Sequence, residues 1–266
     1  MSTKKRVVII SDIHAGSPFG LTAPDWQVKP SKTKPCSLRR AQLQKAMWDW
    51  YVAKLNELQP INILIVNGDM IEGKSTKTEG IELITADRLV QVDMALAAIT
   101  CAKAEEYLLV RGTAYHSGTG ENYEDIIASK LSCNIEDEGM YSINGLRFNV
   151  VHYVAGGRSP IAFGNSIQTD MAWHNVFAAD SVTNIDADIF VRSHLHKCFD
   201  VSGPRRNQRG IITPGLEGPG SRFGSRICKR PIDIGMIAFD IVSREVWTWA
   251  KHLLITKFQE PQVQIL

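Results

Sequence analysis

The feature that most constrains this chain is a set of short apolar runs, each followed by an aspartate or a histidine. These pairs are Arg6–Ser11 before Asp12, Ile61–Asn67 before Asp69, Leu146–Val151 before His152, and Asp188–Arg192 before His194. Runs of this length and composition are typical of β-strands, and a continuous apolar run indicates a strand buried on both faces. Strand ends in an α/β sheet converge on one edge, where ligands bind. We therefore expect these polar side chains to meet.

Length and composition describe an ordinary globular chain. Its 266 residues are 44% hydrophobic and 22% charged, and the formal net charge is only +2. The overall charge therefore predicts no general attraction to nucleic acid or to a membrane surface. No apolar run approaches the roughly 20 residues of a membrane span, and the N-terminus lacks the apolar stretch of a secretory signal. We expect a cytoplasmic protein with no membrane partner.

The five cysteines are odd in number, scattered along the chain, and form no CxxC pair. This pattern predicts free thiols rather than disulfides or a zinc knuckle. Cys198 lies two residues after His196 and could approach a metal bound there. We expect a packed thiol instead, because cysteine is among the most buried residue types.

Strand-like and helix-like segments alternate along most of the chain, which predicts an α/β fold. An irregular insertion is expected at about 15–37, because its four prolines exclude a regular helix. The tail from Gly210 onward is rich in β-type residues and is expected to complete a second sheet. No repeat or low-complexity linker appears, so residues 1–266 are predicted to form a single domain. The expected helices are Leu38–Leu58, Thr85–Ala104, Tyr123–Leu131 and Gly164–Ala179.

The polar residues at the strand ends have the chemistry of metal ligands. Asp12 and His14 are separated by one residue, as are His194 and His196, so each pair would lie on one side of an extended strand end. Carboxylate and imidazole together suit Mn²⁺, Fe or Zn²⁺, whereas Mg²⁺ and Ca²⁺ prefer oxygen ligands. One such pair occurs often by chance, but the ordered set predicts a two-metal centre. The predicted ligands are Asp12, His14, Asp69, His152, His194 and His196.

The same residues resemble the motifs of the calcineurin-like metallophosphoesterase superfamily, of which four in five match. The matching segments are Asp12-Ile13-His14, Gly68-Asp69-Met70-Ile71-Glu72, His152 and His194-Leu195-His196. Thr213-Pro214-Gly215 also resembles the short turn that follows the last motif. The resemblance runs from about residue 6 to 215. It implies a four-layer α/β/β/α sandwich of two mixed sheets.

The function implied by the resemblance is that of a metal-dependent phosphoesterase. The implied ligands are Asp12, His14, Asp69 and His196 for one metal and Asp69, His152 and His194 for the other. Asp69 would bridge two divalent transition metal ions, which we expect to be Mn²⁺, with Fe or Zn²⁺ as alternatives. A hydroxide shared by the two metals would attack phosphorus. Glu72 matches the acidic end of the second motif and is expected to support the ligands.

The third motif departs from the family pattern. After Leu108–Arg111 the family shows Gly-Asn-His, but this chain reads Gly112-Thr113-Ala114-Tyr115-His116. The asparagine that would ligate the second metal is therefore missing. His116 is expected either to donate a proton to the leaving oxygen or to replace the asparagine as a ligand. Thr113, by its position, and Asn122 are the other possible substitutes.

Local charge gives the clue to the substrate. Eight basic residues lie within 197–230, and more gather in the proline-rich insertion and at the start of the following helix. If these segments flank the metals, they would attract a polyanion, and Phe223 and Trp26 could stack on bases. We therefore expect a phosphodiesterase of the nuclease type that acts on nucleic acid or nucleotides. The predicted substrate-binding residues are Arg111, Arg222 and Arg226.

Two alternatives stay open at this point. A phosphomonoesterase or protein phosphatase would use the same centre on another ester. A non-catalytic scaffold would keep the fold and lose metal ligands, and here the asparagine is absent while six expected ligands remain. Sequence does not specify the substrate, the native metal pair or the oligomeric state.

Overall fold

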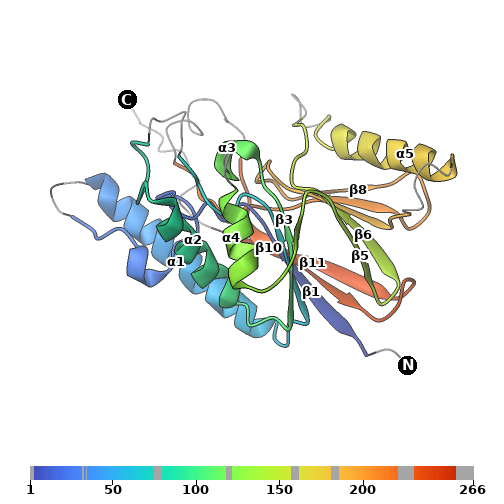
Figure 1. Cartoon of the computed structure of the whole chain (residues 1–266), viewed down its shortest axis with the longest axis horizontal. Helices are drawn as coiled ribbons and strands as arrows, with labels where there is room; N and C mark the ends of the chain where they lie inside the picture. The colour runs from blue at the N-terminus through green and yellow to red at the C-terminus, as the bar shows by residue number, and fades with distance from the viewer. Residues whose placement is uncertain are drawn as a thin grey trace, which may run out of the picture.

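Two mixed β-sheets stack against each other, and helices cover their outer faces (Figure 1). The computed structural model describes residues 3–31, 33, 35–74, 80–117, 122–156, 162–180, 186–220 and 231–255. The six-stranded sheet has the order β11-β10-β1-β2-β3-β4, and the five-stranded sheet has the order β5-β6-β7-β9-β8. The strands are β1 (Lys5–Ile10), β2 (Ile63–Asn67), β3 (Glu106–Val110), β4 (Ile135–Glu136), β5 (Gly139–Ile143), β6 (Leu146–Val150), β7 (Ile189–Arg192), β8 (Phe199–Ser202), β9 (Arg209–Ile212), β10 (Ile234–Ile241) and β11 (Trp247–Leu254).

The central strands of the six-stranded sheet are buried on both faces. β1, β2 and β3 pair in parallel, and every residue of β2 is buried. Along β1, Val8 and Ile10 belong to the core under the outer helices, whereas Val7 and Ile9 belong to the core between the sheets. This division follows from the two-residue period of a strand, which points successive side chains to opposite faces.

Helices form the first and fourth layers. The helices are α1 (Pro35–Glu57), α2 (Arg88–Thr100), α3 (Ala114–Ser117), α4 (Tyr123–Lys130) and α5 (Asn165–Ala179). α1, α2 and α4 bury their apolar stripes against the six-stranded sheet. α5 buries Ile167 and Met171 against Phe190 and Ile212 of the five-stranded sheet. The expected four-layer α/β/β/α sandwich is therefore confirmed. No helix within the described residues is both long and apolar enough to cross a membrane.

The prediction for the tail was wrong in one respect. β9 joins the second sheet, but β10 and β11 extend the first sheet beside β1. Antiparallel pairing of β10 with β1 places Asp240 opposite Arg6, and Arg6 donates to its carboxylate from Nε (2.7 Å) and Nη2 (2.8 Å). Such a two-pronged ion pair supports this pairing of the strands, and the apolar pattern of a single strand does not reveal its partner.

The proline-rich insertion has more structure than its sequence indicated. Pro24–Trp26 forms a 3₁₀-helix, and Pro35 begins α1, a position at which proline is well tolerated. Trp26 is partly buried against the core under α1. Its ring therefore packs within the fold, which removes the main reason for expecting it to stack on bases.

Phe148 tests the packing between the two sheets. Its ring meets Phe239 edge to face, with centroids 5.2 Å apart and an interplanar angle of 85°. Phe148→Ala should lower the free energy of unfolding by about 3–5 kcal/mol, because it leaves a cavity in a closed core. Phe177, which is 47% exposed on α5, is the control, and Phe177→Ala should cost less than about 1 kcal/mol. Urea denaturation measures both, and equal losses would contradict this account of the core.

Candidate metal centre

The six predicted ligands meet at one rim, where the carboxyl ends of strands from both sheets come together. Asp12 and His14 follow β1, Asp69 follows β2, His152 follows β6, and His194 and His196 follow β7. Three of these residues thus come from the first sheet and three from the second. The rim forms only because the two sheets stack with these ends aligned.

The backbone at the rim is unusual. Positive φ angles occur at five of the six residues, namely Asp12 (53°), His14 (48°), Asp69 (47°), His194 (70°) and His196 (49°). Neither the Asp12–His14 segment nor the His194–His196 segment is therefore the extended strand end that its spacing had indicated. Residues other than glycine rarely adopt this conformation, which costs about 1–3 kcal/mol each. Hydrogen bonds between the loops hold it, from Asp12 N to Gly68 O (3.1 Å) and from His14 N to Asp69 O (3.0 Å).

A chain of small polar side chains lies directly behind the rim. Ser11 Oγ is 2.8 Å from Thr213 Oγ1, which is 2.7 Å from Ser193 Oγ. Asn67 Nδ2 donates to the same Ser193 Oγ at 2.7 Å. Ser11 and Asn67 come from the first sheet, and Ser193 and Thr213 from the second. These directional bonds align the strand ends that carry the ligands.

Asp12, His14 and His196 form the first group of candidate ligands. Asp12 Oδ1 lies 3.2 Å from His196 Nε2 and 3.9 Å from His14 Nε2, and the two Nε2 atoms are 3.3 Å apart. Donor atoms that surround a cation at about 2.0–2.3 Å lie about 3–4 Å from one another. The spacing of this group therefore suits a transition metal ion.

Asp69, His152 and His194 form the second group. Asp69 Oδ2 lies 2.9 Å from His152 Nε2 and 3.9 Å from His194 Nδ1. The other carboxylate oxygen, Oδ1, accepts hydrogen bonds from Thr113 N (2.7 Å) and Thr113 Oγ1 (3.1 Å). Asp69 thus presents one oxygen to this group while Thr113 holds the other.

Two buried polar atoms between the groups indicate that cations fit here. Within the described part of the chain, Asp12 Oδ1 and His152 Nε2 have no hydrogen-bond partner of adequate geometry, and they lie 3.8 Å apart. Leaving such atoms unsatisfied is costly, so a native structure normally accounts for them. A pair of cations coordinated by the two groups would satisfy both atoms.

The histidines are anchored in the way that metal ligands usually are. His14 Nδ1 lies 3.0 Å from Glu72 Oε2, and His152 Nδ1 donates to Asn67 O at 2.6 Å. In both rings this leaves Nε2 directed at the centre. A metal-binding histidine typically has its second nitrogen bonded to a carboxylate or carbonyl, which fixes the tautomer and the ring orientation. The expected supporting role of Glu72 agrees with its contact to His14.

The third-motif residues lie in three different environments. Thr113 bonds to Asp69, as described above. His116, on α3, places Nδ1 3.0 Å from Glu72 O and Nε2 4.0 Å from Asp69 Oδ2. His14, Glu72 and His116 also form a third group whose donor atoms lie within 4.8 Å of one another. Asn122 caps α4, where its Oδ1 accepts from Glu124 N at 3.2 Å, so the structure gives it a helix-capping role instead.

The charged side chains at the rim shift one another's pKa values. Burial lowers the pKa of His152, but the Asp69 and Asp12 carboxylates outweigh burial and raise it to about 9. Burial would raise the pKa of Asp69, yet His152 holds this pKa well below its usual range. His116 differs, because burial and the neighbouring His14 lower its pKa. At neutral pH the metal-free centre therefore contains ionised Asp12 and Asp69 carboxylates and a largely neutral His116.

Two acidic residues at the centre escaped the sequence analysis. Glu217, beyond β9, places Oε2 3.9 Å from His14 Nε2 and 3.7 Å from His196 Nδ1. Glu124, in the first turn of α4, is fully buried, and burial together with Asp69 raises its pKa to about 7. The sequence signal for Glu217 was its place just after Thr213-Pro214-Gly215. Glu124 had no comparable signal.

The structure does not bring Arg111 to the centre. Its guanidinium is bonded to Asp125 Oδ1 (2.7 Å) and Asp137 Oδ1 (3.1 Å) near the surface, so its predicted role in substrate binding has no support in the geometry. Arg222 and Arg226, together with Phe223, lie outside the described residues. Cys198 is buried, as expected of a packed thiol, and burial raises its pKa to about 11.

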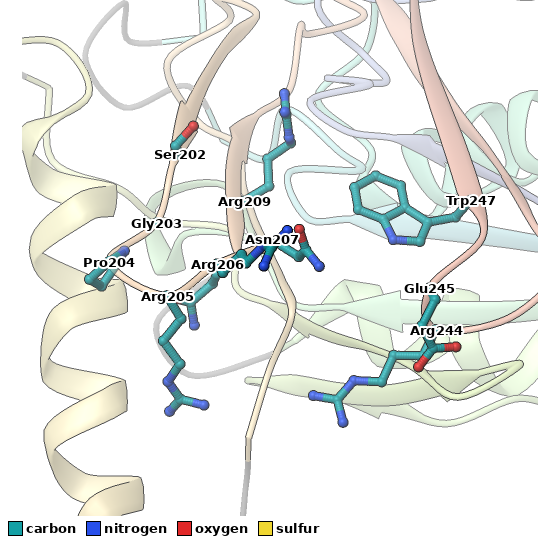
Figure 2. A pocket seen from close by; sticks show the side chains of 11 residues that line it. Ser202, Gly203, Pro204, Arg205, Arg206, Asn207, Arg209, Arg244, Glu245 and Trp247 are labelled. Carbon is teal, nitrogen blue, oxygen red and sulfur yellow. The ribbon is translucent and has the colours of Figure 1, made fainter.

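Much of the basic segment predicted to flank the metals lies elsewhere. Arg205, Arg206 and Arg209 line a cavity of about 620 Å³ together with Arg244 and Trp247 (Figure 2). This cavity lies where β9 begins, whereas the rim lies where β9 ends. Carboxylates neutralise most of these cations: Arg205 pairs with Asp186, Arg209 with Asp200 (2.6 Å) and Arg244 with Asp188 (2.7 Å).

Two stacked mixed sheets, covered by helices and joined by an aspartate–histidine rim, agree with the α/β/β/α sandwich that the motif resemblance implies. No protein-family model and no curated protein sequence matches the chain. Among solved structures, the chain is similar to a Vps29 of Entamoeba histolytica complexed with Zn²⁺, at 12% identity and a TM-score of 0.48, covering 95% of this chain and 94% of that one.

Two further solved structures resemble the chain at a similar level. One is an archaeal phosphodiesterase at 11% identity and a TM-score of 0.44, covering 94% of this chain and 99% of that one. The other is a purple acid phosphatase from seeds of yellow lupin, Lupinus luteus, at 13% identity and a TM-score of 0.45, covering 92% of this chain and 50% of that one. At such low identity and similarity, the function must be inferred from the side chains at the rim.

Protons should compete with metal at this centre. Because the pKa of His152 is raised from 6.5 to about 9, a cation must displace its proton at neutral pH. The affinity for Mn²⁺ should rise between pH 6.5 and 9 and then level off, with proton release measured by calorimetry in buffers of different ionisation enthalpy. Protonation of His152 also stabilises the metal-free fold. This stabilisation is fully present below about pH 6.5 and is lost as the pH rises through 9. An affinity that is flat over this range would contradict the coupling.

Proposed function

We propose that this chain is a phosphoesterase that depends on two divalent metal ions. The observation that supports it most is the pair of carboxylate–imidazole groups, with Asp12 Oδ1 and His152 Nε2 unsatisfied between them. Asp12, His14 and His196 would hold one cation, and Asp69, His152 and His194 would hold the other. Mixed oxygen and nitrogen donors favour Mn²⁺, Fe or Zn²⁺.

The residues of the rim prepare the site for an anionic substrate. When bound, a metal pair supplies an activated water and neutralises charge on the phosphoryl oxygens. Asp12 and Asp69 are almost fully buried and would hold the cations away from bulk water, in an environment where electrostatic interactions are strong. His194 lies on the open side, with its side chain 34% exposed, so substrate would enter past this ring.

A phosphodiester of a nucleic acid or nucleotide is the substrate class that we propose. A diester group carries one negative charge, whereas a monoester carries about 1.5–2 and calls for additional cations. Lys197, which directly follows His196, is paired with Asp233 at 2.8 Å and is not available for that purpose. Tyr153, 58% exposed, lies against the His194 ring with centroids 5.0 Å apart and offers a face on which a base could stack.

His116 fits the role of a ligand better than the role of a proton donor. A backbone carbonyl only accepts hydrogen bonds, so the contact from His116 Nδ1 to Glu72 O requires the proton to be on Nδ1. In the neutral ring Nε2 then carries a lone pair, and Nε2 is the atom that faces Asp69. A lone pair there can bind a cation and replace the missing asparagine, but it cannot protonate a leaving group.

Hydrolysis of bis-p-nitrophenyl phosphate with added Mn²⁺ tests the proposed activity. The diester should turn over at least tenfold faster than p-nitrophenyl phosphate, and chelation should abolish both reactions. Asp69→Asn should reduce the rate by more than 100-fold. Asp87→Asn removes a carboxylate that caps α2 and should leave the rate unchanged. Two equivalents of bound metal without turnover of any phosphoester, including DNA and RNA, would favour the scaffold instead.

His116→Ala separates the two roles of that histidine. If His116 is a ligand, the variant should bind one Mn²⁺ about 10–100-fold more weakly and should lose activity equally on p-nitrophenyl and alkyl diesters. A proton donor behaves differently, because an alkyl leaving group needs the proton and a p-nitrophenyl group does not. Unchanged Mn²⁺ affinity with a selective loss on alkyl diesters would refute the ligand assignment.

A further inference from the structure

Glu124 is a fully buried carboxylate that bridges two loops of the rim. It lies in the first turn of α4, and its Oε1 accepts a hydrogen bond from Met70 N at 2.8 Å. Its Oε2 accepts from Gly112 N, also at 2.8 Å. Met70 belongs to the loop after β2 and Gly112 to the loop after β3. A single side chain therefore joins two loops that approach the second metal group from neighbouring strands.

Both amides that Glu124 binds belong to neighbours of Asp69. Met70 follows Asp69 in the chain, and Gly112 precedes Thr113, whose N and Oγ1 donate to Asp69 Oδ1. The loops are also in close contact, because a Cβ on Gly112 would collide with Asp69 N and Oδ1. The position of Gly112 is therefore transmitted directly to the Asp69 carboxylate.

The carboxylate of Glu124 is itself firmly placed. Asn122 caps α4 by accepting from Glu124 N, and Ile127 and Ala128 bury the helix in the core under the first sheet. Burying a carboxylate is costly unless hydrogen bonds compensate, and here both oxygens accept from a backbone N–H. A residue that only stabilised α4 would not need contacts with both loops.

We propose that Glu124 is a positioning residue for the second metal, and this inference rests on the proposed function. It holds Asp69 in its left-handed conformation, with φ of 47°, and directs Oδ2 toward His152 and His194. The placement of Asp69 carries particular weight here, because Thr113 occupies the asparagine position and bonds to Asp69 Oδ1. Glu124 acts through Asp69 and touches neither metal nor substrate.

Mn²⁺ titration of Glu124→Gln tests this role. The glutamine presents an NH₂ group to one of the two amides, so one of the hydrogen bonds from Met70 N and Gly112 N is lost. One of the two Mn²⁺ equivalents should bind about 10–100-fold more weakly, as is usual for partners of metal ligands, and the other should change by less than about threefold. His152→Ala should weaken the same equivalent, and the electron paramagnetic resonance signal of a coupled Mn²⁺ pair should decrease in both variants.

Asp87→Asn is the matched control. Asp87 also accepts from two backbone N–H groups, those of Leu89 (2.8 Å) and Val90 (3.4 Å), but it does so at the start of α2. This variant should keep both Mn²⁺ affinities and the coupled signal. If Glu124→Gln only lowers the melting temperature of the metal-free protein and retains both affinities, the inference is refuted while the proposed function stands. A wild type that binds no Mn²⁺ would overturn both.

Amide hydrogen exchange in the wild type gives a test that does not depend on folding of a variant. In the metal-free protein the Met70 and Gly112 amides should exchange at least 100-fold more slowly than the Gly80 amide, which lies in a turn. Glu124→Asp, whose shorter side chain reaches only one amide, should release the other. Unprotected Met70 and Gly112 amides in the wild type would contradict the two hydrogen bonds that Glu124 accepts.

Discussion

The structure depends on placing two aspartates, Asp12 and Asp69, in an environment that is nearly free of water, with exposed fractions of 0% and 1%. An isolated buried carboxylate costs several kcal/mol, so each must have positive partners nearby. His152 lies within 4 Å of both carboxylates, at 3.8 Å from Asp12 Oδ1 and 2.9 Å from Asp69 Oδ2. The aspartates come from one sheet and this histidine from the other. The stacking of the sheets therefore provides the charge balance at the rim, and two bound cations would complete it.

Most of the fold could be predicted because its elements are marked locally. The continuous apolar run before Asp69 became β2, and the helix expected at Leu38–Leu58 became α1. Partners of strands are a different matter, since β10 is apolar along both faces and would suit a central position in either sheet. Its place beside β1 brings together residues far apart in the chain, such as Arg6 and Asp240, which are 234 residues apart. No local pattern contains that information.

The site was predictable to the extent that its residues stand directly at strand ends. Asp12, His152 and the other expected ligands met for that reason, and their role as ligands stays a prediction. Glu124 could not be found, because its contact with Met70 and Gly112 exists only after α4 packs on the sheet. The expectation for Arg111 failed for a related reason. The sequence shows a basic residue next to a motif, but it does not show that Arg111 pairs with Asp125 of α4.

The strain at the rim explains why so many polar contacts surround it. Five left-handed residues at about 1–3 kcal/mol each represent a cost comparable to the whole stability of a typical domain. Such conformations persist only where neighbouring contacts over-determine them. Here those contacts are the hydrogen bonds between the loops, the Ser11–Thr213–Ser193–Asn67 chain and the Glu124 clamp. Apolar burial is not directional and could not fix these angles. The polar residues around the rim therefore maintain a geometry that the hydrophobic core alone would let relax. Because only the folded chain presents this geometry, cation binding would also stabilise the fold.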